Sequence, residues 1–258
     1  MKQVTASVIA NSEIMPRVHL IWLESPQIVS DTKPGQFFMV RCGEDTLLRR
    51  PLSVHQLDSN NLAFLFSVEG KGTHWLSKRQ VGNRIDLFGP LGNGYSIHPD
   101  SQNLLLLAGG VGIAPLRFLA DEAIEQGKTV TLLMGTQTSG HLYPESLLPL
   151  GIASAKATED GTVGYRGMIT DLLSDYIDWA DQVFACGPFP MYHAMVDKYW
   201  KFLNNKPVQV SLEVRMGCGF GVCYGCTVKT RNGLKQVCRN GPVFDLDEIL
   251  WNEVNPLE

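Results

Sequence analysis

The sequence predicts a β-barrel plus α/β fold with three parts in chain order. Residues 1–98 are expected to form an antiparallel β-barrel, residues 99–210 a parallel-sheet α/β domain, and residues 211–258 a small cysteine-rich domain. Three observations support this division. Short β-rich segments come first, strands that alternate with helices follow, and four of the six cysteines lie in the last part.

The first part is a succession of short strand-like segments. Residues 17–25, 35–42 and 62–68 are rich in aromatic or β-branched side chains, and turn-forming stretches such as KPG and DSNN separate them. Several short strands at this spacing are typical of a small antiparallel barrel.

The second part changes to strands that alternate with helices. The apolar stretch at 103–108 runs into GGVGIAP and then into a helical stretch at 115–126, and a second strand follows at 129–135. Residues 181–190 again read as strand, loop and the start of a helix. This alternation predicts an open parallel sheet, in which ligands bind outside the carboxyl ends of the strands.

Composition excludes several classes of protein. The chain of 258 residues has 44% apolar and 19% charged residues and a net charge of −4, which gives no reason to expect nucleic acid or an anionic membrane as partner. Its longest apolar run, at 104–116, is too short and too rich in glycine to span a bilayer, and the first residues lack the apolar stretch of a signal peptide. We therefore expect a cytoplasmic protein, in which disulfides are rare.

The loop GGVGIAP lies where a dinucleotide-binding loop belongs, between a strand and a helix. Gly110 and Gly112 would let the backbone approach a pyrophosphate, and Pro115 suits the first turn of the helix. The third glycine of the usual motif is replaced by Pro115, and no acidic residue closes the second strand, so ribose recognition is unexplained. A tight strand–helix turn is the alternative interpretation. The absence of arginine from the following MGTQTSG disfavours a 2′-phosphate.

Two barrel segments carry groups that bind phosphates. RRPLS, at 49–53, offers arginines that can hold a phosphate and a serine hydroxyl that can bond the edge of a flavin ring. EGKGTHWL, at 69–76, is expected to be a glycine turn that opens a short helix, with Thr73 near the free N–H groups. Taken singly, a solvated charge pair and an N-capped turn are the simpler interpretations.

The cysteine-rich part has the spacing C-x4-C-x2-C-x11-C, formed by Cys218, Cys223, Cys226 and Cys238. The first three cysteines match the plant-type ferredoxin spacing, which holds a [2Fe–2S] cluster. The glycines between them leave room for a cluster and can direct N–H groups at its sulfurs. Zinc more often uses two separated C-x2-C pairs or histidines, and it stays open as the alternative.

The order of these motifs along the whole chain resembles the ferredoxin-reductase family. The resemblance implies FAD on the barrel and NAD on the following domain. The residues that it implies for FAD are Arg50, Pro51, Leu52, Ser53, Leu65, Phe66, Ser67, Gly72 and Thr73. Those that it implies for NAD are the loop from Gly109 to Pro115, with Gly110 and Gly112, and Cys186, Gly187 and Pro188. For Cys186 a purely structural role is the alternative. Glu213 and Met216, just before the cysteine cluster, could approach the flavin.

Leu52, where many members have tyrosine, together with the cysteine-rich tail and TEDGTVGYRGMITD at 158–171, narrows the resemblance to the electron-transfer subunits of NAD-dependent dihydroorotate dehydrogenases. Ser67 departs from the pattern, since many such subunits have arginine there. The resemblance implies that a separate FMN-containing catalytic subunit oxidises dihydroorotate in pyrimidine (UMP) biosynthesis. Its electrons would pass through the cluster and FAD to NAD⁺, within a heterotetramer of two subunits of each kind.

Two other functions fit the same motifs. One is a reductase subunit with a different partner, such as a hydrogenase or a second ferredoxin-reductase chain. The other is a zinc-bearing interaction module without enzymatic activity. No catalytic acid–base pair or nucleophile is expected, because a redox relay requires only that its cofactors be positioned.

Overall fold

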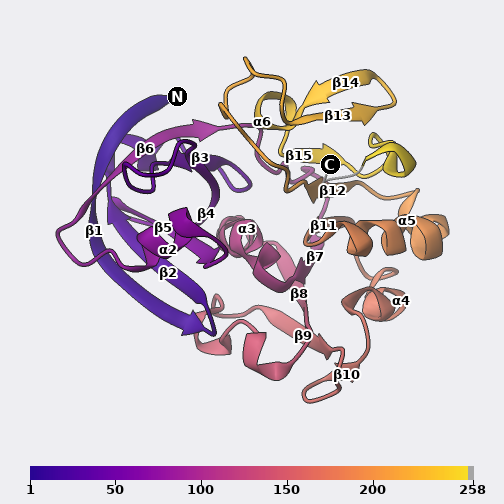
Figure 1. Cartoon of the computed structure of the whole chain (residues 1–258). Helices are drawn as coiled ribbons and strands as arrows, with labels where there is room; N and C mark the ends of the chain where they lie inside the picture. Colours follow the sequence, from indigo (N-terminus) through magenta and orange to yellow (C-terminus); the bar gives the residue numbers. More distant parts are fainter. Residues whose placement is uncertain (255–258) are drawn as a thin grey trace.

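The first part of the chain is a closed barrel of six strands, in the order β1-β2-β5-β4-β3-β6 (Figure 1). The computed structural model describes residues 1–254. The barrel strands are β1 (Lys2–Met15), β2 (Val18–Glu24), β3 (Phe37–Val40), β4 (Arg50–Asp58), β5 (Asn61–Ser67) and β6 (Arg84–Leu91). Two short helices, α1 (Pro26–Val29) and α2 (Lys71–Ser77), join them. Every pairing is antiparallel, so the predicted barrel is confirmed.

The second part is a seven-stranded sheet in the order β10-β9-β8-β7-β11-β12-β15. Its strands are β7 (Asn103–Gly109), β8 (Thr129–Thr136), β9 (Ala153–Thr158), β10 (Tyr165–Arg166), β11 (Gln182–Cys186), β12 (Val208–Ser211) and β15 (Val243–Asp245). All neighbours are parallel except β15, which runs antiparallel to β12. The central strand β7 reads as a continuous apolar run because helices cover both faces of the sheet.

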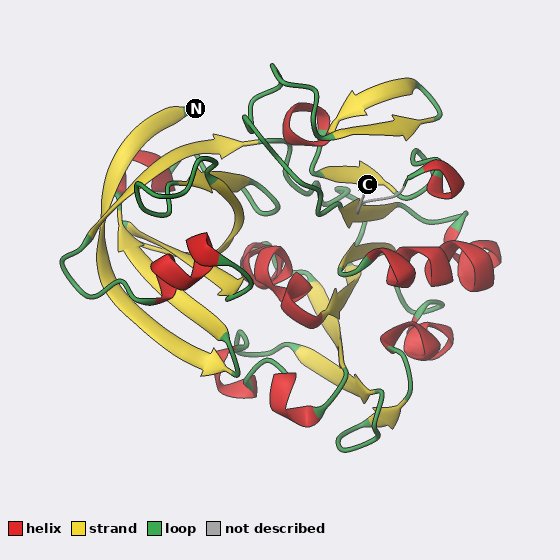
Figure 2. Ribbon diagram, in the orientation of Figure 1, coloured by secondary structure: helices red, strands yellow, loops and turns green. Residues whose placement is uncertain are grey.

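The helices of this part cover the two faces of the seven-stranded sheet (Figure 2). α3 (Ile113–Glu125) lies on the side of the barrel, while α4 (Leu173–Tyr176) and α5 (Phe189–Leu203) cover the other face. No helix within residues 1–254 has the length and apolar character needed to cross a membrane.

The cysteine-rich part consists of a loop, a hairpin and a short helix. The hairpin is β13 (Thr227–Thr230) with β14 (Gly233–Gln236), and α6 (Val237–Asn240) follows it directly. β15, from the same stretch of chain, then completes the edge of the large sheet. The third part therefore shares a hydrophobic core with the α/β domain.

A buried histidine ties the barrel to the α/β domain. His55, on β4, is fully buried, and its Nδ1 lies 3.1 Å from the carbonyl oxygen of Ala114 in the first turn of α3. Its Nε2 lies 2.9 Å from the hydroxyl of Tyr143, in the loop after β8. Burial lowers the pKa of His55 to about 3, so the ring is neutral and donates one hydrogen bond while accepting the other. This bridge fixes the orientation of α3 against the barrel.

Candidate functional site

The two loops predicted to receive NAD lie side by side. β7 and β11 are neighbouring parallel strands, with Ala108 paired to Cys186, so their loops leave the same edge of the sheet. A Cβ added to Gly109 would lie 2.7 Å from the ring of Pro188 and 3.2 Å from the Cα of Gly187. The structure therefore brings these predicted residues together at the carboxyl ends of the strands, where open α/β sheets bind ligands.

The glycines of the first loop differ in their surroundings. Gly110 has φ +56°, and a Cβ placed on it would find nothing within 4 Å, so its backbone faces open space. Gly112 is packed inward, because a Cβ there would collide with the carbonyl group of Cys186 and lie 2.9 Å from the nitrogen of Gly187. We expected both glycines to face a pyrophosphate. Packing between the two loops explains Gly112, whereas Gly110 has the open surface that a ligand needs.

A buried tyrosine, which the sequence did not single out, fixes the second loop. The Tyr192 hydroxyl accepts a hydrogen bond from the Gly187 nitrogen at 3.0 Å and donates one to the Ser211 carbonyl oxygen at 2.7 Å. It thereby links the ends of β11 and β12. In the sequence, Tyr192 is marked only by its position in the first turn of an aromatic-rich helix. Such a pattern indicates hydrophobic packing as readily as a residue that holds a loop.

Cys186 and Glu213 lie close together at this edge. Burial, together with the charge of Glu213, raises the pKa of the Cys186 thiol to about 12, so it stays protonated. Glu213 is accessible to solvent, yet surrounding protein and the charge of Glu69 raise the pKa of its carboxyl. The sequence suggested Glu213 as a residue that could approach the flavin from its position just before the cysteine loop alone.

The two arginines of the barrel motif are used differently. Arg49 forms a bidentate ion pair with Asp86, with nitrogen–oxygen distances of 2.8 and 2.9 Å. The Arg50 guanidinium lies against Gly72, where an added Cβ would come within 2.9 Å of its Nε. No carboxylate pairs with Arg50 among residues 1–254. Arg50 is therefore the arginine that remains available to a phosphate, as its place in the motif predicts.

The other residues predicted to bind FAD lie on the strands beside Arg50. Pro51, Leu52 and Ser53 continue β4 and are half-buried, and Ser67 is half-buried at the end of β5. Leu65 and Phe66 are buried. Thr73 acts on its own turn, since its hydroxyl accepts hydrogen bonds from the nitrogens of Glu69 (2.9 Å) and Gly70 (3.2 Å).

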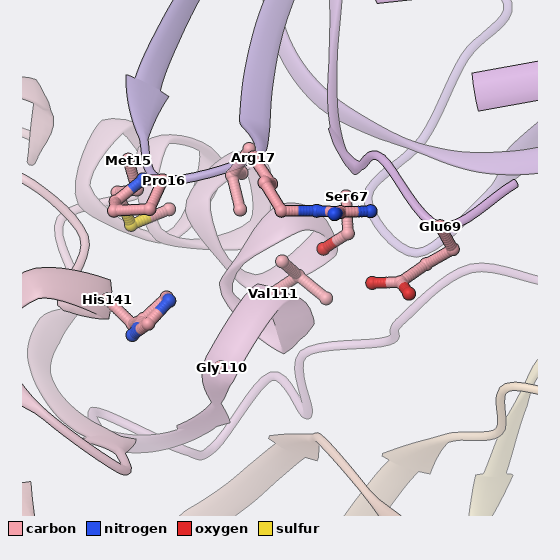
Figure 3. A pocket seen from close by; sticks show the side chains of 9 residues that line it. Met15, Pro16, Arg17, Ser67, Glu69, Gly110, Val111 and His141 are labelled. Atoms are coloured by element: carbon pink, nitrogen blue, oxygen red, sulfur yellow. The ribbon is translucent and has the colours of Figure 1, made fainter. Parts of the chain in front are cut away.

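A cavity of about 290 Å³ joins the two sets of predicted residues (Figure 3). It brings Ser67, from the predicted FAD set, together with Gly110, from the predicted NAD set. Its other lining residues are Met15, Pro16, Arg17, Val18, Glu69, Val111 and His141. Arg17 and His141 belong to no motif in the sequence and reach the cavity only through the fold, so the sequence does not predict them.

The cysteine loop is arranged for anionic sulfur. Burial alone would raise the pKa of the Cys218 thiol, but hydrogen bonds from the backbone N–H groups of Phe220, Cys223 and Val222 lower it to about 6. Gly219 and Gly221, with φ of +82° and +90°, make this turn possible.

The remaining thiols are crowded. The Cys238 nitrogen lies 3.5 Å from the sulfur of Cys226, and both side chains are buried. Burial, together with the neighbouring Cys226 and Cys218, raises the pKa of Cys238 to about 12. No three histidine, cysteine or carboxylate side chains within residues 1–254 form a group that could hold a single metal ion. The donor set of four thiols with N–H groups directed at sulfur fits an iron–sulfur cluster.

The cysteine loop packs against the barrel next to the arginine motif. A Cβ on Gly219 would lie 2.7 Å from the sulfur of Met39, and Met39 pairs with Pro51 across β3 and β4. The rings of Phe220 and Phe88 also meet edge to face, with centroids 5.6 Å apart. One strand therefore separates the cysteine loop from the motif predicted to bind flavin.

Two family models match the chain. Residues 213–250 match the iron-sulfur cluster binding domain of dihydroorotate dehydrogenase B, which includes all four cysteines. Residues 106–197 match the oxidoreductase NAD-binding domain, which includes both strand-end loops. The first match favours the iron–sulfur interpretation over the zinc alternative.

Individual proteins resemble the chain over nearly its full length. The electron transfer subunit of dihydroorotate dehydrogenase B (NAD(+)) from Desulforamulus reducens is 35% identical over 257 residues, which cover 95% of this chain and 97% of that protein. The structure of an NADH-dependent reduced ferredoxin-NADP oxidoreductase superposes with a TM-score of 0.86 at 31% identity, over 96% of this chain and 90% of that one. A ferredoxin NADP⁺ reductase from Neisseria gonorrhoeae with bound FAD and NADP shares the fold (TM-score 0.65, 18% identity, 80% of this chain and 92% of that one).

Proposed function

Because this chain belongs to the family of dihydroorotate dehydrogenase B (NAD(+)) electron transfer subunits, we propose that it passes electrons from a dihydroorotate-oxidising catalytic subunit to NAD⁺. One observation carries the proposal: the cysteine loop packs on the barrel strand next to the arginine motif, and a cavity joins Ser67 of the predicted FAD set to Gly110 of the predicted NAD set. An electron path from the cluster through FAD to NAD⁺ requires these three groups in this order and close to one another.

The barrel residues are proposed to hold FAD. Arg50 binds a phosphate, Ser53 and Ser67 bond polar edges of the cofactor, and Leu52 packs on its apolar surface. Thr73 positions the turn that carries Gly72. When bound, flavin exchanges electrons in pairs with nicotinamide and singly with an iron–sulfur centre.

The strand-end loops are proposed to hold NAD(H). Gly110 presents free backbone to the pyrophosphate, and the loop of Gly187 and Pro188, held by Tyr192, forms the opposite wall. Cys186 remains a neutral thiol in this wall and carries no charge that would compete with the cofactor.

The cysteine loop is proposed to face the partner. Cys218, Cys223, Cys226 and Cys238 bind the [2Fe–2S] cluster. Three apolar side chains of this stretch are exposed by 44%, 63% and 69%: Phe220, Val222 and Tyr224. Exposed apolar groups beside a redox centre suit a stable subunit interface. The partner that we propose is an FMN-containing subunit, in a cytoplasmic heterotetramer of two plus two that serves pyrimidine biosynthesis.

The test is the reconstituted complex. Cys226→Ser is expected to abolish dihydroorotate-dependent NAD⁺ reduction and to spare NADH oxidation by small acceptors, because only the former requires the cluster. Cys42→Ala is the matched control, since Cys42 is a buried cysteine of the barrel core. Dihydroorotate-dependent reduction that survives Cys226→Ser would place the cluster off the path.

The similarity to the NADH-dependent reduced ferredoxin-NADP oxidoreductase favours a second candidate, a reductase subunit that serves another partner. Co-purification separates the two candidates. A natural partner that carries FMN and oxidises dihydroorotate supports the first, and a partner that exchanges electrons with ferredoxin supports the second.

A further inference from the structure

The hairpin between β1 and β2 reaches from the barrel to the glycine loop, and its tip carries Arg17. Arg17 lines the cavity that also contains Ser67 and Gly110 (Figure 3). Its place follows from the register of β2 and β5, which pairs Val18 with Ser67. Arg17 is thus a cation at the junction of the two predicted dinucleotide sites, more than thirty residues away from any motif in the sequence.

The Arg17 side chain is held in place before any ligand binds. Its backbone nitrogen donates to the Glu13 carboxylate at 2.7 Å, and its carbonyl accepts from the Val68 nitrogen at 2.8 Å. One end of its guanidinium donates to the Val68 carbonyl, which holds the side chain along the end of β5 beside Ser67. Within residues 1–254 no other hydrogen bond or ion pair uses this guanidinium, so its remaining donors are available.

The conformation of Arg17 is an unusual one. Its φ of +59° is in the left-handed region, which side chains with a Cβ adopt only at a cost in free energy. The neighbouring Pro16 and Val18 restrict the tip further, and the strand pairing imposes the conformation on whichever residue stands there. A residue such as asparagine would fit the backbone better than arginine.

The opposite wall of the cavity is suited to an anion. Gly110 turns its free backbone toward the cavity, and His141 lines it from the loop after β8. The Glu69 carboxylate lies at the other end of the cavity from His141, on the far side of Arg17 and Ser67 (Figure 3). It would repel a phosphate at that end and could accept hydrogen bonds from hydroxyl groups, which places a phosphate between Arg17 and Gly110.

We propose that Arg17 is a binding residue for a phosphate of a dinucleotide that spans the barrel and the α/β domain. The proposal rests on the proposed function, because it requires FAD and NAD(H) as ligands. Arg49 is paired with Asp86, and neither Arg49 nor Arg50 is among the residues that line this cavity. The forked guanidinium of Arg17 binds phosphate oxygens, with Ser67 beside it.

The test is Arg17→Asn in the full chain with its cluster. Asparagine accepts the positive φ, so the thermal midpoint and the cluster absorbance are expected to stay at wild-type values or rise. Two constants are measured. One is the dissociation constant for FAD added back to the flavin-free protein, and the other is the KM for NADH with a small acceptor. One of them is expected to rise about ten- to hundredfold, with a weaker dependence on salt, because a charge-assisted hydrogen bond is lost.

The two constants identify the source of the phosphate. A change in FAD affinity assigns the phosphate to FAD, and a change in KM assigns it to NADH. The control is Arg84→Gln, which removes an exposed arginine of β6 outside the cavity and is expected to change neither. Both constants unchanged in Arg17→Asn would overturn the proposal. Wild-type protein that binds no FAD and oxidises no NADH would instead overturn the proposed function.

Discussion

Acidification is expected to weaken the junction between the barrel and the α/β domain through His55. The ring is fully buried, and its two nitrogens contact Ala114 and Tyr143 at 3.1 and 2.9 Å. Burial, with a smaller contribution from Arg117, lowers its pKa from 6.5 to about 3, although the Ala114 contact opposes the change. Protonation in place would put a positive charge in a fully buried site, and this desolvation is the largest cause of the lowered pKa.

The direction and magnitude of the change in unfolding free energy with pH follow from proton linkage. Between pH 6.5 and pH 3 the unfolded chain binds a proton at His55 that the folded protein does not, so stability is complete above pH 6.5 and falls as the pH is lowered. Each pH unit below 6.5 costs about 1.4 kcal/mol. His55 alone should therefore remove about 2 kcal/mol of the free energy of unfolding between pH 7 and pH 5.

The measurement is urea unfolding of the cofactor-loaded protein, followed by tryptophan fluorescence at pH 7 and pH 5. The comparison is with His55→Gln, which keeps hydrogen-bonding groups but cannot titrate. The variant is expected to be less stable at pH 7 and to lose about 2 kcal/mol less than the wild type on acidification, because all other titrating groups are shared. Equal losses in the two proteins would refute the assignment of a neutral buried ring.

Gly112→Ala is expected to lower the thermal midpoint and the soluble yield, because the added Cβ would collide with the backbone of Cys186, which cannot move cheaply. Gly140→Ala, where the nearest atom would be 3.7 Å away, should leave both unchanged, and equal losses would contradict the packing argument. Arg50→Gln is expected to reduce FAD affinity about tenfold or more. Arg49→Gln should instead cost about 1 kcal/mol of unfolding free energy through its lost ion pair. Flavin content after purification separates the two arginines, and equal flavin loss would show that the motif acts through stability alone.

Local patterns along the chain were sufficient for the fold class, and the cysteine spacing predicts four ligands. Short alternating segments predict strands, and a strand that runs into a glycine loop and a helix predicts a parallel sheet, because these signals depend on neighbours in sequence. The spacing of Cys218, Cys223 and Cys226 similarly predicts a loop that wraps one cluster, since a tight turn is a local property. The motif order then indicated the family that the comparisons show.

The different roles of residues that look alike in the sequence are visible only in the tertiary structure. Arg49 and Arg50 are adjacent in sequence, yet only the position of Asp86 on β6 shows which of them is already paired. Gly110 and Gly112 also read alike, and only the packing of one loop on the other shows that Gly112 is enclosed.

Signals between neighbours in the chain therefore predicted the elements and their order correctly, and they predict Cys218, Cys223 and Cys226 as ligands of one cluster. Only the tertiary structure brought Arg17, Ser67, Gly110 and His141 around one cavity. The physical reason is that strand register and the docking of α3 on the barrel arise from contacts between residues far apart in the chain. No local pattern encodes the register that pairs Val18 with Ser67.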